Sequence, residues 1–383
     1  MAGKHGRIYQ VLLIAVLILN SSCERDNDIP EVNTNRLSAL PEQVNFPDNN
    51  PFSIEKSQLG RLLFWDPILS GSKDVACASC HHPDFGFADG RDLPIGVGGD
   101  GLGPSRRAGA VIKRNSPSVI NAAFNGIDIN GTYNPNAAPM FWDNRAHSLE
   151  EQALLPILSL DEMCGDAITE EDILDSVIQR LRAIPQYRAL FAGAFGNDLI
   201  DDNRIAMAIS TFQRTLISNN SRFDQYMRGN IDALDNREIR GMNTFINSGC
   251  VDCHSGPMLS DFQLHTLSVP NHSLLEDRGA TSAFDFRTPS LRNLNLTAPY
   301  MHNGSFDGLR DVLEFYNDIS GEGQRSQNPD VDQNQIDQDA RNLRLNNDDF
   351  DGLLAFLNTL NDEIDVSIPL EVPSKLSVGG NIH

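Results

Sequence analysis

Apolar residues recur every three or four positions along several parts of the chain, which is the spacing of an amphipathic helix. The clearest runs are residues 170–184, 202–217 and 347–362. We find no convincing run of alternating apolar and polar residues, which a half-buried strand would show. The pattern therefore predicts an all-α protein.

Another predicted helix follows a His-Asn-Gly-Ser turn within residues 300–318. Its apolar positions follow the i, i+3, i+4, i+7 spacing of an inward face and end in a phenol. They are Leu309, Val312, Leu313 and Tyr316. Packing alone can explain a tyrosine there, so the question is what Tyr316 faces.

The chain repeats itself, which predicts two tandem domains. The pattern G-x-x-x-F lies in helix-like segments at Gly60–Phe64 and Gly241–Phe245. Each segment is followed by a similar loop, RNSPSVINAAF around Pro117 and FRTPSLRNLNL around Pro289. The chain turns polar over residues 220–236, and we place the domain boundary there.

The segments outside the repeat set the limits of these domains. We assign residues 51–225 to the first domain and 226–365 to the second, followed by a tail at 366–383. Residues 24–50 are polar and predict a tether that holds the body off a membrane.

The first residues have the features of an export signal. The longest apolar run, Val11–Leu19, is too short for a membrane span of roughly 18 residues. A basic start, this run and small residues before Cys23 predict a secretory signal at 1–23. Cys23 favours a lipoprotein acylated at that residue, whereas Asn20 fits the motif poorly and leaves plain secretion open. Either form places the mature protein outside the cytoplasm, in the periplasm.

The formal net charge of −22 argues against a nucleic-acid partner, which needs a cationic surface. The charge is compatible with docking a basic protein, although a solvated acidic surface is the commoner meaning.

Two C-x-x-C-H motifs use four of the six cysteines, and the chance expectation of one such motif is roughly 0.002 at this composition. In this spacing, two thiols on one turn form thioethers to the haem vinyl groups, and the adjacent imidazole becomes the proximal iron ligand. We therefore predict two cytochrome c-like domains, each with one covalently attached c-type haem. The residues are Cys77, Cys80 and His81 for the first haem, and Cys250, Cys253 and His254 for the second.

Other uses of these cysteines explain less of the pattern. A Cys₄ zinc site would have to join two distant pairs and would leave both histidines unexplained. A thioredoxin-like redox motif expects a βαβ context that is missing, and disulfides do not require the histidines. Cys164 is left over, and we expect a buried or half-exposed free thiol.

The repeat can be extended without gaps by laying residues 141–156 on 301–316, which places Pro156 where Tyr316 sits. If both helix ends overhang a haem, one domain offers an oxygen ligand and the other a side chain that cannot ligate. One iron would be closed, as suits electron transfer, and one open to a small oxidant. Simple packing of both residues is the alternative.

Cleavage of a peroxide O–O bond needs a base that moves a proton between the two oxygens, and a polar group that positions them. The segment after Trp142 offers Glu150, Glu151, Gln152 and Glu162. We expect the first two to face solvent and the last two to lie nearer a pocket at the helix end. Spacing alone does not separate them, and a glutamate after a helix is more often solvated.

Several segments resemble the bacterial di-haem cytochrome c peroxidase and MauG family. They are CASCHHPDFGFADG, RNSPSVINAAFN, FWDNRAHSLEEQALLPI, CVDCHSG and TAPYMHNGSFDGLRDVLEFYN, and the match covers residues 50–360. The resemblance implies that the first haem reacts with peroxide and that electrons enter at the second. Glu162 matches the family's distal acid or base, and Gln152 matches a glutamine of the same pocket. Trp142 matches a tryptophan between the haems, although a buried tryptophan is core by default.

The resemblance further implies a calcium ion between the domains. Asn115 and the backbone carbonyls of Thr297 and Pro299 match its ligands, and oxygen-only ligation suits this cation. From the sequence alone Asn115 would be a turn residue.

Two positions depart from the peroxidases of this family. Those enzymes carry a histidine after the first haem that caps its iron at rest, whereas no histidine lies between His82 and His147 here. His82 adjoins the proximal ligand and should not reach the other face, so we expect an open first haem. At Tyr316 the peroxidases have an axial methionine and the MauG type a tyrosine, which favours ferric iron and a low potential. Met301 and Met258 are the nearby substitutes.

The sequence therefore predicts a di-haem peroxidase that reduces hydrogen peroxide with electrons from a small exported donor, a cytochrome c or a cupredoxin-like protein. A MauG-like enzyme that oxidises residues of a partner protein is the first alternative. A non-enzymatic di-haem electron carrier is the second, and the open first haem counts against it. The resemblance also allows a homodimer.

Overall fold

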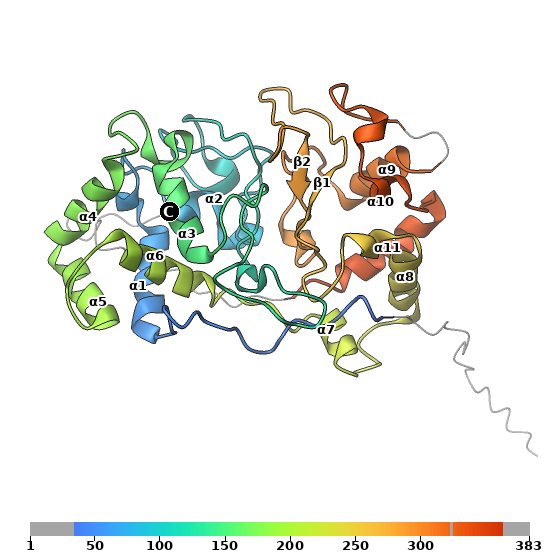
Figure 1. The fold of residues 1–383 in the computed structure, drawn as a ribbon, viewed down its shortest axis with the longest axis horizontal. Coiled ribbons are helices and arrows are strands. Elements are labelled where there is room, and N and C mark those ends of the chain that lie inside the picture. The colour runs from blue at the N-terminus through green and yellow to red at the C-terminus, as the bar shows by residue number, and fades with distance from the viewer. Residues whose placement is uncertain (1–33, 322–324, 363–383) are drawn as a thin grey trace, which may run out of the picture. The chain divides into compact units, whose positions relative to one another are not determined.

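The computed structural model describes residues 34–321 and 325–362, and this part of the chain is mostly helical. Its helices are α1 Ile54–Trp65, α2 Cys77–Cys80, α3 Leu149–Leu158, α4 Ile173–Ala183, α5 Pro185–Phe195, α6 Asp202–Gln213, α7 Arg222–Met227, α8 Asn236–Asn247, α9 Leu309–Ile319, α10 Gln338–Arg341 and α11 Phe350–Asn358. The four helices that periodicity predicts are α4, α6, α9 and α11. We call α1–α6 the first half and α7–α11 the second half (Figure 1).

A two-stranded antiparallel ladder departs from the all-α expectation. It joins β1, Leu264–Thr266, to β2, Asp285–Arg287, and pairs His265 with Phe286. Each strand has three residues, which is too short for alternation to be visible in the sequence.

Two helix pairs, one in each half, cross at a glycine. Helix α1 packs on α6, and α8 packs on α11 (Figure 1). A β-carbon on Gly60 would overlap the carbonyl oxygen of Ala208, and one on Gly241 would overlap that of Gly352. Both glycines begin the repeated G-x-x-x-F pattern, so the repeat marks a close helix crossing in each half.

The gapless alignment that pairs Pro156 with Tyr316 is also present in the backbone. The loop before α3 closes with an antiparallel bridge between Met140 and Ala146, and the loop before α9 closes with one between Tyr300 and Phe306. These four positions match in the alignment. The two helix ends are therefore structural counterparts.

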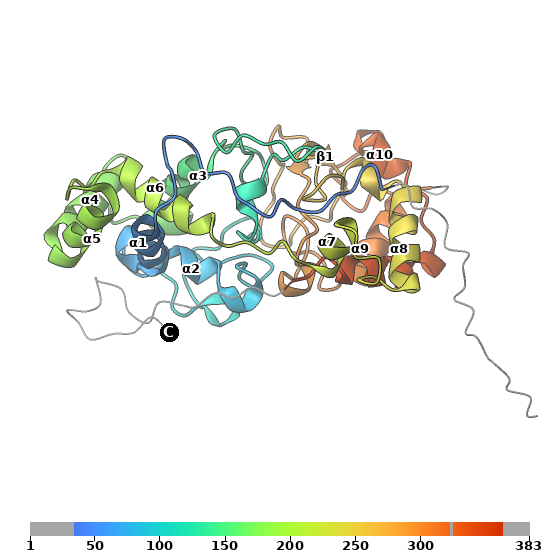
Figure 2. The same ribbon diagram turned by 90° about the horizontal axis from the view of Figure 1, so that it is seen from below.

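Residues 34–50 pack on the body of the molecule, which corrects the tether prediction for this part of residues 24–50. Leu37 lies in the core of the second half, and Leu40 is buried among apolar residues of both halves. Asn50 is fully buried and donates to Glu150 of α3 at 2.8 Å. The segment runs from near α8 to α1 (Figure 2) and joins the halves through the buried side chains of Leu37, Leu40 and Asn50.

Helix α7 packs with the second half. Phe223 belongs to the core formed by α8 and α11, and its amide donates to the Thr359 carbonyl at 3.1 Å. Asp224 forms an ion pair with Arg292 at 2.6 Å. The change of core therefore falls between α6 and α7, earlier than the expected boundary of 225/226.

In the described part of the chain no helix is long and apolar enough to cross a membrane. The predicted signal at 1–23 and tail at 366–383 lie outside the described residues, as do residues 24–33 of the predicted tether.

The glycine crossing predicts a difference between two Gly→Ala variants. We expect Gly60→Ala to lower the free energy of unfolding by about 1–3 kcal/mol, because the methyl group meets backbone that cannot move aside. Gly193→Ala on α5 is the control: nothing lies near its added β-carbon, and alanine favours the helix by up to about 1 kcal/mol. Denaturant unfolding followed by circular dichroism measures both. Equal stability of the two variants would contradict the close crossing of α1 and α6 at Gly60.

Candidate active site

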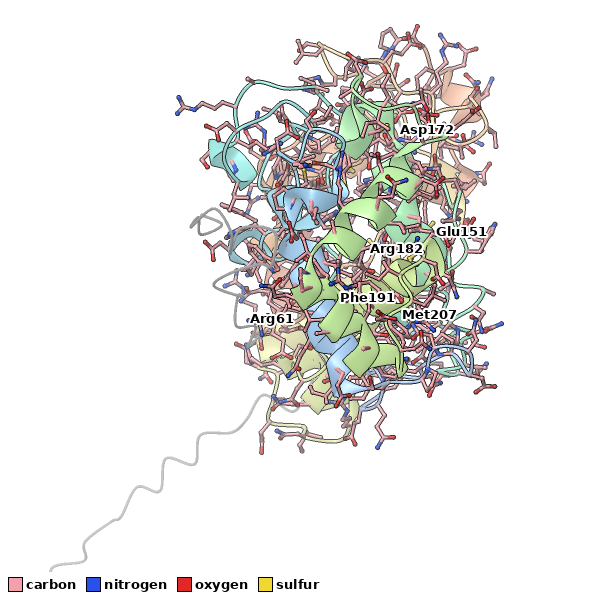
Figure 3. The ribbon with its side chains drawn as sticks, turned by 90° about the vertical axis from the view of Figure 1, so that its left-hand side faces the viewer. Arg61, Glu151, Asp172, Arg182, Phe191 and Met207 are labelled. Carbon is pink, nitrogen blue, oxygen red and sulfur yellow. The ribbon has the colours of Figure 1, made fainter. Side chains whose placement is uncertain are left out.

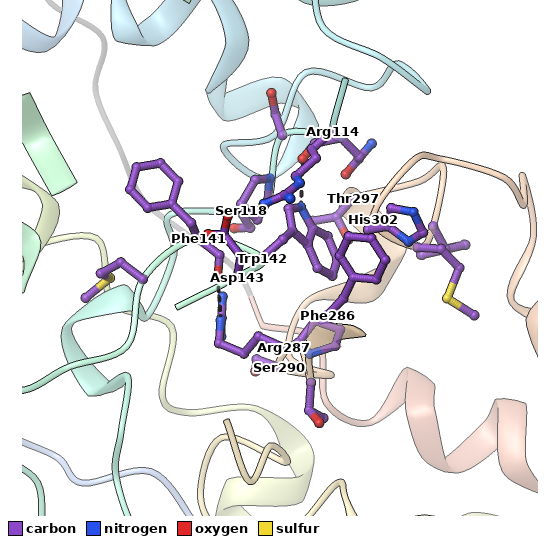
Figure 4. Close-up of a pocket in the computed structure, with 18 of the residues that line it drawn as sticks. Arg114, Ser118, Phe141, Trp142, Asp143, Phe286, Arg287, Ser290, Thr297 and His302 are labelled. Carbon is purple, nitrogen blue, oxygen red and sulfur yellow. Dashed lines mark hydrogen bonds and ion pairs between the residues drawn. The ribbon is translucent and has the colours of Figure 1, made fainter. Parts of the chain in front are cut away.

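One cavity of about 840 Å³ reaches both C-x-x-C-H motifs, and its walls come from both halves (Figure 4). It is lined by every residue that the sequence selects for haem attachment, distal chemistry and calcium. These are Cys77, Cys80, His81, Cys250, Cys253, His254, Glu162, Gln152, Trp142, Tyr316, Asn115, Thr297 and Pro299. Side chains far apart in the sequence therefore meet at one site.

The two motif histidines are oriented in the same way. The Nδ1 atom of His81 lies 2.9 Å from the Phe87 carbonyl oxygen, and that of His254 lies 3.0 Å from the Leu259 carbonyl oxygen. Burial lowers the pKa of both imidazoles, so each is neutral and donates from Nδ1. The Nε2 lone pair is then free, which is the state of a metal-ligating histidine. Both histidines therefore fit the proximal position of a c-type haem.

The repeated loops hold these histidines in place. Ser118 donates from Oγ to the Gly86 carbonyl at 2.6 Å in the first half. Ser290 donates to the Met258 carbonyl at 2.7 Å in the second half. In each half the serine of the Pro-Ser dipeptide thus fixes the chain that follows the C-x-x-C-H motif.

Glu162 is presented to the cavity by a single π-helical turn, Leu160–Cys164, directly after α3. The turn is held on two sides by glycines, since a β-carbon on Gly71 or Gly96 would overlap its backbone carbonyls. Burial raises the pKa of Glu162, and Arg145 and Arg114 only partly oppose this shift. The structure gives this carboxyl no hydrogen bond within the described residues. It is thus available to a ligand in the cavity.

The open side of the first half is formed by the end of α3. Gln152 and Pro156 both line the cavity, whereas Glu150 is bound by Arg214 at 2.6 Å and Glu151 is exposed. The expectation that Glu150 faces solvent is wrong, because Arg214 and Asn50 draw its carboxylate into a buried polar cluster. Proline has no side-chain donor atom, so it leaves this end without a ligand.

His82 lies away from the cavity, as the sequence predicts. Its ring packs edge-on against Trp65 with centroids 5.7 Å apart, and it accepts a hydrogen bond from the Asp84 amide. The histidines that line the cavity in the described part of the chain are His81, His254, His265 and His302.

At the other end of the cavity, α9 presents Tyr316. Burial raises the pKa of its phenol, and the nearby Cys253 and Cys250 add to the shift. The structure gives the hydroxyl no hydrogen-bond partner among the described residues. Met258 and Met301 line the same cavity, but Tyr316 is the residue at the counterpart of Pro156. Tyr316 is half-buried and lines the cavity, so its hydroxyl is available to a group bound there.

Between the two ends, the halves exchange backbone hydrogen bonds. The Asn115 amide donates to the His302 carbonyl at 2.7 Å, and the Arg287 amide donates to the Trp142 carbonyl at 2.7 Å. The Trp142 indole in turn donates from Nε1 to the Asn115 carbonyl at 2.9 Å. Trp142 therefore lies at the junction of the halves, where Figure 4 shows it beside Arg287, Phe286 and His302.

His302 is a residue that sequence reasoning missed, although the alignment pairs it with Trp142. Its ring stacks on Phe286 with centroids 3.6 Å apart, and burial lowers its pKa to about 3. Arg114 lies over the same Phe286 ring and forms ion pairs with Asp143 and Asp277. The alignment of the two repeats could have identified His302 as the counterpart of Trp142. No sequence pattern identifies the ion pairs of Arg114 with Asp143 and Asp277.

Arg287 tests whether the cavity fits a haem. Its Nε donates to the Phe141 carbonyl at 2.7 Å, and it forms no ion pair with a described residue. Burial lowers the pKa of its guanidinium to about 10. A buried cation of this kind needs an anionic partner, and a haem carries two propionate groups. The apolar walls, the two motif histidines and Arg287 together fit the group.

Two of the three expected calcium ligands, Asn115 and Pro299, lie close together. The Asn115 side-chain nitrogen is 2.7 Å from the Arg91 carbonyl and 3.5 Å from the Pro299 carbonyl, and Thr297 lines the same cavity. A cation would need the amide reversed, so that its oxygen faces the carbonyl of Pro299.

Two further groups are a core thiol and a histidine in the cavity wall. Cys164 is a buried free thiol in the core of the first half, as expected, and its Sγ lies 3.2 Å from the Ile168 carbonyl. His265 lies between Asp261 and Asp337 at 2.9 and 2.8 Å, which helps raise its pKa to about 11. Sequence reasoning gave no role to His265.

Comparison with known proteins gives consistent results. A family model described as di-haem cytochrome c peroxidase matches residues 54–232. The methylamine utilization protein MauG of Methylophilus methylotrophus is 34% identical over 360 residues, which cover 91% of this chain and 94% of that protein. The cytochrome c551 peroxidase of Pseudomonas aeruginosa is 34% identical over 337 residues, which cover 84% of this chain and 83% of that protein.

A solved structure is also similar. It is a MauG-like protein associated with microbial copper homeostasis, with a TM-score of 0.69 and 30% identity. The match covers 85% of this chain and 95% of that one. The fold therefore extends over nearly the whole described part of the chain.

The free phenol of Tyr316 predicts a spectral change on substitution. In the ferric holoprotein we expect Tyr316→Phe to alter the absorption and electron paramagnetic resonance (EPR) signals of one haem, because the oxygen ligand is lost. Tyr300→Phe is the matched control, since Tyr300 lines the same cavity but donates to the Leu294 carbonyl at 3.0 Å. Identical spectra for Tyr316→Phe and the native protein would exclude Tyr316 as a haem iron ligand.

Proposed function

This chain belongs to the di-haem cytochrome c peroxidase and MauG family, and from that premise we propose that it reduces hydrogen peroxide at one of two covalently attached haems. The observation that carries the proposal is the difference between the two ends of the cavity. One end has Pro156 and a buried glutamate, and the other has an unpartnered phenol. Such an arrangement suits one open and one closed iron.

The attachment residues of the two haems would be the two C-x-x-C-H motifs. His81 and His254 would be the proximal ligands, and Tyr316 would be the second ligand at the second haem. The haems supply iron that reacts with peroxide at one site and iron that exchanges electrons at the other. Arg287 would pair with a propionate.

The residues around the first site have the properties that peroxide cleavage needs. Glu162 would take the proton from one peroxide oxygen and return it to the other, and burial keeps its carboxyl basic enough to do so. Gln152 would hold the oxygens by a hydrogen bond from its amide. Pro156 leaves room for the substrate and competes for no ligand position.

Electrons would enter at the second half and cross at Trp142. The Trp142 indole is held by the Asn115 carbonyl at the junction of the halves and lines the cavity that reaches both C-x-x-C-H motifs, which supports this route. The donor would be a small exported cytochrome c or cupredoxin-like protein.

A second candidate function is oxidation of residues in a partner protein. Tyr316 favours it, because an oxygen ligand stabilises high oxidation states, and a MauG protein is among the relatives. A cytochrome c551 peroxidase of equal identity supports the peroxidase equally.

The remaining features of the proposal concern the surroundings of the enzyme. A calcium ion would bind Asn115 and the carbonyls of Thr297 and Pro299 and link the halves. The protein would be exported to the periplasm and anchored as a lipoprotein through Cys23. It would act as a monomer or homodimer.

Mixing the ferric holoprotein with peroxide tests the proposed function. We expect a high-spin ferric signal at rest from the open first site, a rapid spectral change on adding peroxide, and reversal by a reduced small cytochrome. If both the high-spin signal and the response to peroxide are absent, the proposed peroxidase function is wrong and a non-enzymatic electron carrier is favoured.

The buried carboxyl of Glu162 predicts the pH dependence of the peroxide reaction. Its base form is required and its pKa is raised, so the rate should fall as pH drops through a value above the ordinary 4.5. We expect Glu162→Gln to slow the reaction roughly 10²–10⁴-fold and to remove this acid limb. Glu151→Gln, on the same segment but exposed, should keep both the rate and the limb. An unchanged limb in Glu162→Gln would exclude Glu162 as the base.

A further inference from the structure

A buried tyrosine–carboxylate pair lies in the first half, outside the cavity. Tyr187 of α5 donates a hydrogen bond from its hydroxyl to Oδ2 of Asp66, and both side chains are completely buried. The other carboxylate oxygen accepts from the Ile68 amide at 2.9 Å. Figure 3 views the side of the molecule formed by α4, α5 and α6, with Phe191 of α5 labelled.

Two pairs of sequence neighbours and one ring contact lead from this pair toward the first haem site. Asp66 follows Trp65, the last residue of α1, which is 2% exposed. The Trp65 ring meets His82 edge-on with centroids 5.7 Å apart and an interplanar angle of 74°. His82 adjoins His81, the expected proximal ligand. The sequence and the cavity give His82 and Trp65 no other role.

The second half has no such chain. Aligning α1 with α8 at Gly60 and Gly241 places Ile246 and Asn247 at the positions of Trp65 and Asp66. Ser255 follows His254 where His82 follows His81. In the described residues between α9 and α11 the α-helix is α10, Gln338–Arg341, and it contains no tyrosine. The whole chain of side chains is therefore confined to the half that is proposed to react with peroxide.

We propose that Tyr187 is a redox-active residue that supplies an electron to the first haem site when the donor protein is absent. In this step the phenol O–H bond breaks, the proton moves to the Asp66 carboxylate, and one electron passes through Trp65 and His82 to the haem oxidised by peroxide. The products are a neutral tyrosyl radical, a protonated Asp66 and a haem reduced by one electron. The inference rests on the proposed function, which supplies the oxidant.

The surroundings of Tyr187 suit this step better than those of Tyr300 and Tyr133. Oxidised phenols are strong acids, so the reaction needs a base within hydrogen-bond reach. Asp66 is such a base, and its negative charge together with burial raises the pKa of Tyr187, which keeps the proton on the phenol until oxidation. Tyr300 donates to a backbone carbonyl, which is not basic enough, and the hydroxyl of Tyr133 accepts from the Asn45 amide at 2.7 Å.

The same hydrogen bond also anchors α5 to the end of α1, so a variant must separate the two roles. Asp66→Asn keeps an oxygen that accepts the phenol hydrogen bond, but this amide cannot take the proton. A purely structural role predicts no tyrosyl radical at Tyr187 in any variant. A redox role predicts a radical that depends on both partners.

The experiment uses ferric holoprotein mixed with one equivalent of peroxide, without donor, and frozen over a series of times for EPR spectroscopy. We expect a tyrosyl signal in the native protein that is lost in Tyr187→Phe and in Asp66→Asn and retained in Tyr133→Phe. Trp65→Phe should delay its appearance. The resting absorption spectrum and circular dichroism of each variant show whether it is folded.

The outcomes separate the redox role of Tyr187 from the proposed peroxidase function. A tyrosyl signal that persists in Tyr187→Phe, or is absent from native protein that does react with peroxide, overturns the inference and leaves the proposed function standing. No response of the native haem spectrum to peroxide overturns both. If Asp66→Asn fails to fold, the comparison of Tyr187→Phe with Tyr133→Phe still decides whether Tyr187 carries the radical.

Discussion

The two backbone hydrogen bonds that the halves exchange are the constraint on which the site depends. Asn115 donates to the His302 carbonyl and Arg287 to the Trp142 carbonyl, both at 2.7 Å. Buried amides and carbonyls that lose a partner cost about 1–3 kcal/mol each, so the halves cannot slide without a penalty at both bonds. These bonds hold Trp142 at the junction of the halves, in the wall of the cavity that reaches both C-x-x-C-H motifs.

The two halves repeat the same structural features but differ in a few side chains of the cavity. The glycine crossings, the histidine-to-carbonyl bonds and the serine contacts occur in both halves and hold the two C-x-x-C-H motifs in equivalent surroundings. Within the cavity the halves differ at matched positions, Pro156 against Tyr316 and Trp142 against His302. Equivalent scaffolds therefore place unlike side chains at matched points, which gives two sites of the same fold different chemistry.

The sequence predicted much of this, for identifiable reasons. Motif spacing and the gapless repeat depend on local residue order, so the two C-x-x-C-H motifs and the pairing of Pro156 with Tyr316 could be found from the sequence. The burial of Glu150 was missed, because its partner Arg214 is distant in the sequence. The same holds for Arg287 and for the Arg114 ion pairs, whose roles arise only where two halves meet. The tether was misread because polar composition hid the few buried residues Leu37, Leu40 and Asn50.

That amino-terminal segment has a consequence for how the protein assembles. Leu37 packs in the core that Phe223 and the helices α8 and α11 complete, and the Gly256 amide donates to the Arg36 carbonyl. The residues that are synthesised first thus complete the core of the half that is made last. That core cannot close until α11 has been synthesised, so the contacts of Leu37 form between the two ends of the described chain and late in folding.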